Sequence, residues 1–324
     1  MPELPEVEVV RAGVEPAVTG AVIAGVEIFE PRSLRRHAGS SESFVSALEG
    51  QRVHAAVRRG KFLWLPLSSG NALVIHLGMS GQVLLRSPGA DADRMLRIRL
   101  HLDHPDHGEL WLNFVDQRIF GSMAVDTMQP TSDGFAGGFS GGISGGFGGA
   151  LGSGFGGALG GADGVAPGEW ARLIPSQVAH IARDPLDPAF SPQAFAQALS
   201  RKNSGIKRAL LDQTLISGIG NIYADEALFA ARLHYAQPAN SLSRPKVTKL
   251  LAAVREILGK ALVEGGTSFD AQYVNVNGES GYFSHSLNAY GQQGTPCPRC
   301  GTILVREAFM NRGSHFCPRC QRLR

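Results

Sequence analysis

All four cysteines of this 324-residue chain lie in its last 28 residues, as two Cys-Pro-Arg-Cys turns separated by sixteen residues. Each turn can supply two thiolates, and this spacing is typical of a tetrahedral zinc site with a hairpin between its halves. Two disulfides or four free thiols are the alternatives, and cytoplasmic redox conditions argue against disulfides. We therefore expect one structural Zn2+, on which folding of this module depends. The expected ligands are Cys297, Cys300, Cys317 and Cys320.

The other concentration of chemistry is the opening segment MPELPEVE, which holds two prolines and three glutamates. Removal of Met1 would leave Pro2 with a free secondary amine that is partly unprotonated near neutral pH. Such an amine can form an iminium with a carbonyl-equivalent carbon, which suits opening a sugar and eliminating its phosphates. Glu3 could then act as general acid and base, and Glu6 could orient the site. The segment is equally a good helix start, and taken alone it favours that structural interpretation.

A third feature is a cluster of positive charge at the C-terminus. Six arginines follow Cys297 against a single acid, Glu307, although the whole chain has a net charge of only +3. This density indicates a phosphate-binding surface, with a solvated tail as the alternative. No run of eighteen apolar residues exists and the acidic N-terminus is unlike a secretory signal, so we expect a cytoplasmic protein without membrane contact.

The elements that must position these residues begin with an expected helix over residues 3–16. Short apolar runs bounded by turn signals then predict a β-sandwich or barrel. In residues 96–102 strict alternation predicts one buried face and one face carrying Arg97, Arg99 and His101. The strands are expected at 62–67, 72–79, 82–86, 96–102, 109–115 and 120–125.

Residues 134–164 hold 16 of the chain's 41 glycines and no charge before Asp163. Ordering so much glycine is entropically costly and little apolar surface is available to offset the cost, so we expect a flexible insert. Residues 190–265 instead predict helices, with caps at Ser191 and Ser243 and a stop at Gly265 and Gly266. Residues 221–233, after the SGIGN turn, predict an amphipathic helix.

We therefore expect an α+β protein made of four parts. They are an N-terminal catalytic β-sandwich domain with an N-terminal helix (1–130), the glycine-rich insert (131–168), a helical domain (169–295) and a zinc finger (296–324).

Five further motifs accompany the cysteines, and together they make the chain resemble formamidopyrimidine-DNA glycosylase, a bacterial family that excises oxidised purines such as 8-oxoguanine. The resemblance covers nearly everything except the insert, and it implies that the helical domain contains a helix-two-turn-helix. PELPE, rather than PEGPE, resembles this branch and not the endonuclease VIII branch, which prefers oxidised pyrimidines. The motifs are PELPEVE (2–8), RRGKFLW (58–64), HLGMSG (76–81), DQRIFG (116–121) and ISGIGNIYADEALF (216–229).

The resemblance implies catalytic roles for five residues. Pro2 would attack the anomeric carbon and displace the damaged base, Glu3 would shuttle protons, and Glu6 would support the site. Lys61 would assist β-elimination and Arg312 would contact phosphate and assist δ-elimination. The product would be a one-nucleotide gap with phosphates at both ends.

The resemblance also implies DNA contacts. Met79, Arg118 and Phe120 would fill the hole left by the flipped base, with Arg118 bonding the orphaned cytosine. Core packing is the alternative for Met79 and Phe120. Lys202 and Lys207 would bind DNA, with a solvated helix face as the alternative, and Asn221 would hold phosphate.

Loop 267–282 would close over the flipped base. The chain departs from the family pattern at Ile119, where a second basic residue is common, and near Arg94, where a histidine is absent. The expected partner is double-stranded DNA with oxidised bases or abasic sites, bound by a monomer in the bacterial cytoplasm at the nucleoid. Endonuclease VIII-like specificity, a non-catalytic lesion-binding protein, or a zinc-ribbon module on an unrelated scaffold are the alternatives.

Overall fold

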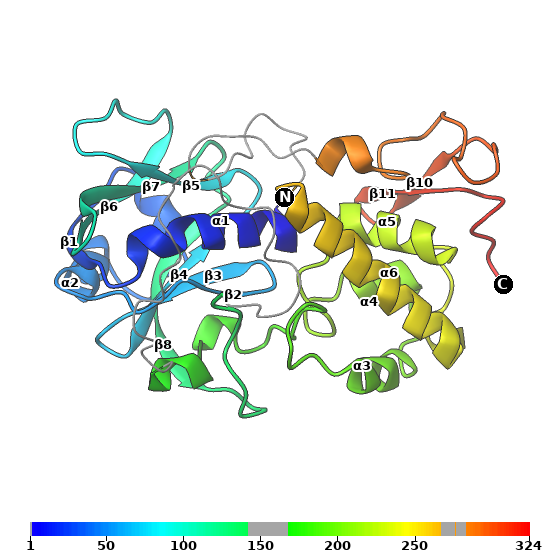
Figure 1. Ribbon diagram of the computed structural model, residues 1–324, viewed down its shortest axis with the longest axis horizontal. Helices are drawn as coiled ribbons and strands as arrows, with labels where there is room; N and C mark the ends of the chain where they lie inside the picture. Colours follow the sequence, from blue (N-terminus) through cyan, green and yellow to red (C-terminus); the bar gives the residue numbers. More distant parts are fainter. Residues whose placement is uncertain (1, 142–167, 267–275, 277–282) are drawn as a thin grey trace.

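The computed structural model describes residues 2–141, 168–266, 276 and 283–324. Strands fill one half of the molecule, and helices with the C-terminal hairpin fill the other (Figure 1). Helix α1 (Leu4–Val18) lies along the strands and directs its N-terminal end toward α6 (Arg244–Val263) in the helical half. The first residues of the chain are therefore at the junction of the two halves.

The strand half is a sandwich of two antiparallel sheets, which confirms the expected fold class. The first sheet has the order β1-β6-β7-β5 and the second β2-β3-β4-β8-β9. All six predicted strands are present, while β1, β2 and β9 were not predicted. The bounds are β1 Val22–Ile28, β2 Val57–Arg59, β3 Phe62–Pro66, β4 Asn71–His76, β5 Gly81–Arg86, β6 Leu96–His104, β7 Gly108–Asp116, β8 Ser122–Pro130 and β9 Leu173–Pro175.

The sandwich core lies between the two sheets and beneath α1. Val7, Val10 and Val14 recur at helical spacing on the inner face of α1 and are buried against the strands. In β6 the predicted alternation holds, since Ile98, Leu100 and Leu102 are buried while the intervening residues are partly exposed. Helix α2 (Ser41–Leu48) adds Phe44 and Leu48 to the same core.

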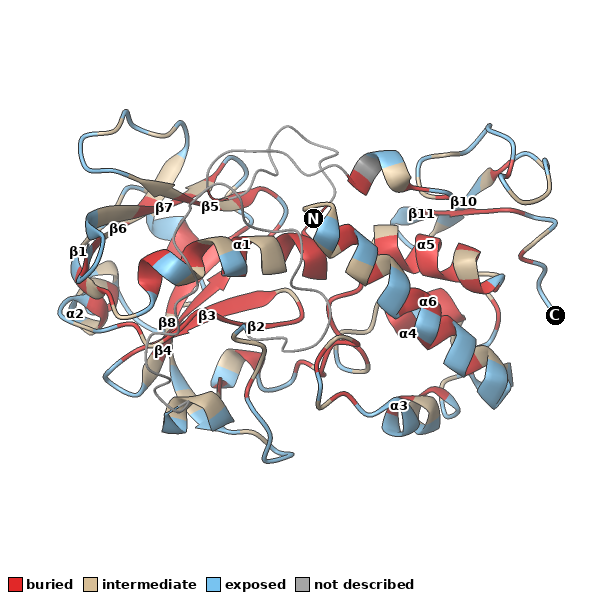
Figure 2. Cartoon of the chain, in the orientation of Figure 1, coloured by how far each residue is buried: buried red, intermediate tan, exposed pale blue. Residues whose placement is uncertain are grey.

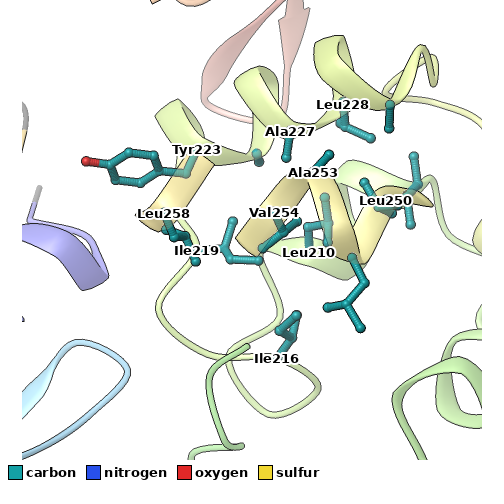
Figure 3. Close-up of a cluster of buried hydrophobic side chains, with 14 of the residues drawn as sticks. Leu210, Ile216, Ile219, Tyr223, Ala227, Leu228, Leu250, Ala253, Val254 and Leu258 are labelled. Carbon is teal, nitrogen blue, oxygen red and sulfur yellow. The ribbon is translucent and has the colours of Figure 1, made fainter. Parts of the chain in front are cut away.

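The helical half packs around α5 (Asn221–Ala231), whose apolar residues meet those of α6, such as Leu250 and Val254 (Figure 3). The prediction that α5 is amphipathic is wrong. It is buried on nearly every face, including the charged Asp225 and Glu226, because α6 and the zinc finger cover it from different sides (Figure 2). The remaining helices are α3 Pro192–Leu199 and α4 Ile206–Leu210, with 3-10 turns at Pro31–Leu34 (η1), Glu169–Arg172 (η2), Ser176–Val178 (η3), Ala239–Ser241 (η4) and Phe283–Ser286 (η5).

The helix caps follow the sequence only in part. The Ser191 hydroxyl accepts a hydrogen bond from the Ala194 amide at 3.1 Å and caps α3 as predicted. Ser243 precedes α6, but its side chain makes no capping hydrogen bond. Gly265 and Gly266 follow α6 with φ of 75° and 83°, the left-handed conformation expected of a glycine stop.

The beginning of the glycine-rich insert is anchored to the sandwich, which corrects the expectation that the insert is flexible from residue 134. The backbone of Phe139 exchanges two 2.8 Å hydrogen bonds with Arg58 at the edge of β2. The Phe139 ring faces the guanidinium groups of Arg11 and Arg58 at 5.2 and 5.9 Å. Asp133 pairs with Arg183 at 2.7 Å. The rest of the insert, 142–164, lies outside the described residues.

In the part of the chain that the structure describes, no helix combines the length and apolar character that crossing a bilayer requires.

Candidate functional site

A cavity of about 710 Å3 lies at the junction of the two halves. Its lining combines the start of α1, the β2–β3 turn, the approach to α4 and the tip of the C-terminal hairpin. Pro2, Lys61, Lys202 and Arg312, four of the predicted site residues, all border it. The fold thus brings together, around one cavity, residues that are distributed over nearly the whole chain.

The start of α1 is fixed against the helical half. The Leu4 amide donates to the Gly218 carbonyl at 2.9 Å, and the Glu3 amide donates to Oε2 of Glu6 at 2.8 Å. Gly218 has φ of 87°, and a Cβ there would lie 2.7 Å from the Leu4 side chain. This turn therefore needs glycine, and it holds the chain terminus in a defined position beside the cavity.

The Glu3 carboxylate accepts hydrogen bonds from backbone amides at the start of α5. Ile222 donates at 3.0 Å and Tyr223 at 3.4 Å, and Gly220 donates as well. Burial is the main cause that raises the pKa of Glu3 to about 7, and the negative charge of Glu6 acts in the same direction. Lys61 and the helix amides oppose this shift. A carboxyl group with this pKa can both donate and accept a proton near neutral pH.

Glu6 and Lys61 complete the surroundings of Glu3. Glu6 is buried, and its Oε1 accepts a 2.6 Å hydrogen bond from the Tyr223 hydroxyl. The Lys61 ammonium donates to the Ile219 carbonyl at 3.0 Å, and burial lowers the pKa of Lys61 from its ordinary value. Glu6 thus orients the α1 start, whereas Lys61 directs a cation toward the cavity.

Met79 and Phe120 are 40% and 44% exposed, so the alternative that they pack in the core is wrong. Arg118 is also exposed. Phe120 and Arg118 belong to the wedge loop, residues 117–121, which follows β7. A Cβ on Gly78 would lie 2.3 Å from the Phe120 backbone, so Met79 and the wedge loop form one closely packed projection.

The buried carboxylate of Asp116 organises this projection. It accepts hydrogen bonds from the Ser80 hydroxyl at 2.5 Å and from the amides of Arg118 and Gly121 at 3.1 and 2.6 Å. Ser80 follows Met79 directly, so one carboxylate connects both loops. Sequence reasoning did not single out Asp116, although its place inside the DQRIFG motif was a usable signal.

The two predicted DNA-binding lysines differ sharply. Lys202 is half-exposed, borders the cavity and pairs with Asp212 at 2.5 Å. Lys207 is fully buried, which contradicts both the expectation that it contacts DNA and the alternative of a solvated helix face. Its ammonium contacts Asp225 Oδ1 at 2.6 Å and donates to the Gly313 carbonyl and the Ser314 hydroxyl, each at 2.9 Å. Lys207 therefore anchors the C-terminal hairpin to α5.

Asn221 is the first residue of α5, and its side-chain amide nitrogen donates to the same Gly313 carbonyl at 3.2 Å. Two neighbouring amides at this helix start, those of Ile222 and Tyr223, are directed to Glu3. A phosphate contact by Asn221 stays a prediction, and the described contacts give it a second role in supporting the hairpin tip.

The four cysteines surround a common centre, as a metal site requires. Their sulfur atoms all lie within 4.8 Å of one another and no disulfide joins them. Four thiolates bound tetrahedrally to zinc at about 2.3 Å have sulfurs about 3.8 Å apart, so the cluster fits one ion. The two Cys-x-x-Cys turns flank the zinc hairpin, β10 (Val305–Phe309) and β11 (Arg312–Phe316). Arg312 is exposed at the hairpin turn and borders the cavity.

Two further side chains were missed by sequence reasoning. The Arg35 guanidinium donates to carbonyl groups of the wedge loop. His315 is buried beside Tyr290 and contacts Asp225, with its amide and its Nδ1 each 3.0 Å from Oδ2. Nothing in the local sequence around either residue indicates these partners.

Comparison with known proteins gives a consistent result along the chain. Residues 1–123 match the family model of the formamidopyrimidine-DNA glycosylase N-terminal domain, and residues 181–272 match that of the H2TH domain. Residues 294–323 match the zinc finger found in FPG and IleRS.

Whole-chain relatives agree with these models. A formamidopyrimidine-DNA glycosylase of Leifsonia xyli is 62% identical over 325 residues and covers 100% of both chains. One of Thermobifida fusca is 52% identical over 99% of this chain and 97% of its own. Among solved structures, Lactococcus lactis Fpg with abasic-site DNA has a TM-score of 0.75 and 27% identity, covering 99% of each chain. MutM with carbocyclic 8-oxo-G DNA has a TM-score of 0.74 and 27% identity, covering 99% of this chain and 100% of that one.

Proposed function

The chain belongs to the formamidopyrimidine-DNA glycosylase family, and from this premise we propose that Pro2 is the nucleophile with which it excises oxidised purines from DNA. As a member of the family, it is a base-excision-repair DNA glycosylase with abasic-site lyase activity. The observation that carries the assignment is the position of Glu3, which follows Pro2 directly at the cavity and has its carboxylate buried against the α5 amides, where its pKa is raised to about 7.

The proposed reaction begins when the Pro2 nitrogen attacks the anomeric carbon of the damaged nucleotide. The bond from the anomeric carbon to the base breaks, and the base leaves with a proton from Glu3. The Pro2 nitrogen gives up its proton to the ionised Glu3, which passes a proton to the ring oxygen O4′ as the C1′–O4′ bond breaks, and the opened sugar is left joined to the enzyme as an iminium. The ionised Glu3 is then available to take up protons released in the following eliminations. Glu6, bonded to the Glu3 amide, keeps the α1 start in place.

Strand cleavage follows from the acidity that the iminium gives to the neighbouring sugar carbon. Loss of that proton expels the 3′ phosphate, and a second elimination expels the 5′ phosphate, before water releases the sugar fragment. Lys61 and Arg312, which border the cavity from opposite parts of the chain, are proposed to neutralise the departing phosphates. The product is a one-nucleotide gap.

We propose that the duplex is held by both halves. Met79 and Phe120 enter the stack, Arg118 bonds the orphaned cytosine, and Lys202 and Asn221 contact phosphate. One zinc ion, held by the four cysteines, has a structural role because four protein ligands leave no open coordination position. The assigned closing loop, 267–282, lies outside the described residues apart from residue 276.

The four expected parts, 1–130, 131–168, 169–295 and 296–324, remain our proposed division of the chain with one change. Because β9 (Leu173–Pro175) pairs with β8 of the sandwich, we propose that the helical part begins after residue 175 rather than at residue 169. We infer that the enzyme acts as a monomer in the bacterial cytoplasm on nucleoid DNA.

The test is covalent trapping of the iminium with borohydride on three duplexes, which carry 8-oxoguanine opposite cytosine, thymine glycol, or an abasic site. We expect a protein–DNA adduct that maps to Pro2 on the first and third duplexes. Pro2→Gly should abolish excision of 8-oxoguanine while leaving the zinc content unchanged. Trapping only on thymine glycol and abasic DNA would replace the purine assignment with endonuclease VIII-like specificity. Binding without an adduct on any duplex would establish a non-catalytic lesion-binding protein.

A further inference from the structure

Arg35 holds three consecutive carbonyl groups of the wedge loop. It follows η1 directly, and its Nη1 donates to the carbonyls of Ile119 at 2.8 Å and of Gly121 at 2.7 Å. Its Nη2 donates to the carbonyl of the intervening Phe120. A planar guanidinium, with several donors in a fixed fork, is suited to gathering neighbouring acceptors in this way.

The conformation of the wedge loop explains why such a contact is needed. Ile119 has φ of 55°, in the left-handed region that a β-branched residue rarely adopts. Strained backbone of this kind persists only where surrounding contacts determine it. Asp116 binds amides of the loop and Arg35 binds its carbonyls, so an anion and a cation hold the backbone from its two polar sides.

The side chains at the tip cannot provide this support themselves. Phe120 is 44% exposed and Met79 is 40% exposed, so little packing fixes their positions. Unstacking a base costs about a few kcal/mol, so a side chain that separates stacked bases must be held firmly in place. In this loop the side chains are held in place by the backbone, and the backbone is held by the groups that bind it.

We propose that Arg35 is a positioning residue for base flipping and for reading the opposite base, acting through the wedge loop rather than through contact with DNA. This inference rests on the proposed function, since it assumes that Phe120 and Arg118 enter the duplex. It assigns to the N-terminal domain a specificity determinant that is not among the residues lining the cavity.

The experiment compares Arg35→Gln and Arg35→Lys with a control, Arg32→Gln. Arg32 lies in η1, is largely exposed and pairs with Glu30, so its loss removes an equivalent surface charge. Single-turnover excision is measured on 8-oxoguanine opposite cytosine and opposite adenine. Borohydride trapping on a preformed abasic site is measured in parallel, because no base has to be flipped there.

We expect both Arg35 variants to excise 8-oxoguanine opposite cytosine about tenfold more slowly, the effect of losing hydrogen bonds to a charged group. The preference for cytosine over adenine should fall in both, while abasic-site trapping changes little. A variant that is merely less folded would lower all three activities by the same factor and leave the preference unchanged.

Arg35→Lys is the decisive substitution, because lysine keeps the positive charge but lacks the forked arrangement of N–H donors of a guanidinium. Normal activity in Arg35→Lys with a loss in Arg35→Gln would make Arg35 a phosphate-binding cation and overturn the proposal. An unchanged preference in both variants would overturn it as well. Absence of trapping in the unaltered protein would instead reject the proposed function, which is a separate and recognisable outcome.

Discussion

The backbone amide of Ile222 donates a 3.0 Å hydrogen bond to Oε1 of Glu3, although 219 positions separate the two residues. The carboxylate that adjoins the proposed nucleophile is therefore also the group that occupies the N-terminus of α5. One side chain thus accepts hydrogen bonds from amides at the helix N-terminus, which have no partner within the helix, and also serves as the proposed proton shuttle. Its protonation state consequently affects both the stability of the domain junction and the chemistry.

The first prediction concerns the pH dependence of stability. Because the pKa of Glu3 is raised to about 7 from its ordinary value of 4.5, the folded protein retains a proton that the unfolded chain has lost in that interval. This contribution to stability is present below about pH 4.5 and declines as the pH rises to about 7. The loss amounts to about 3 kcal/mol in the free energy of unfolding.

Glu3→Gln removes this titration, so the variant and the unaltered protein should differ increasingly between pH 5 and 7 in chemical denaturation. The difference between the two curves isolates Glu3 from the histidines. A constant difference across this range would contradict the raised pKa. The same substitution should abolish excision, because an amide cannot shuttle the proton.

The second prediction separates the two lysines. Lys207→Met leaves Asp225 buried without its ammonium partner and should lower the free energy of unfolding by about 3–5 kcal/mol. Lys202→Ala should leave stability nearly unchanged and make the slope of log affinity against log salt shallower by about 0.9. For both variants we would measure the free energy of unfolding by chemical denaturation and the affinity for DNA as a function of salt concentration. A Lys207 variant that is stable but has the Lys202 salt effect would restore Lys207 as a DNA contact.

The third prediction concerns zinc removal. The zinc hairpin supplies two of the partners of the buried Lys207, the Gly313 carbonyl and the Ser314 hydroxyl. Chelation should therefore unfold the finger, lower the melting temperature and displace Arg312 from the cavity, weakening DNA binding. Zinc content, melting temperature and affinity for an abasic-site duplex are followed together, with zinc re-addition as the control. Undiminished binding by zinc-free protein would show that the finger does not position Arg312.

The fourth prediction concerns Ile119, the position at which a second basic residue is common in the family. Its side chain is on the wedge loop next to two residues proposed to enter the duplex, so a cation there would add a backbone phosphate contact. Ile119→Arg should steepen the salt dependence of binding by about 0.9 in log–log slope. Ile119→Gln serves as the matched control, since it adds polarity without charge. Equal slopes for the two variants would place position 119 away from the phosphates.

Local patterns predicted the parts of this protein that depend on neighbouring residues. The zinc ligands follow from two short turns, and the alternation of β6 gave its buried face correctly. The opening segment itself indicated Pro2, and the resemblance implied roles for Lys61 and Arg312, but the spacing of these residues did not predict that they share one cavity. Their common cavity results from the packing of α1 between the two halves.

Features that depend on distant partners were missed or misjudged. Lys207 has the sequence context of a solvated helix, and only its contacts with Asp225 and the zinc hairpin explain its burial. Arg35 gave no signal, because its partners lie 84 to 86 positions later. Residues 134–141 of the insert were expected to be flexible because their glycines oppose ordering, whereas the free edge of β2 at Arg58 orders them.

The contact between Glu3 and α5 also bears on how the protein is made. Pro2 and Glu3 leave the ribosome near the beginning of synthesis, whereas the amide of Gly220 that binds Glu3 follows 217 positions later. A nascent chain thus carries Glu3 beside the amine but lacks the α5 amides that orient its carboxylate. The site is therefore assembled only after α5 has been made, so its geometry depends on two segments that are synthesised far apart in time.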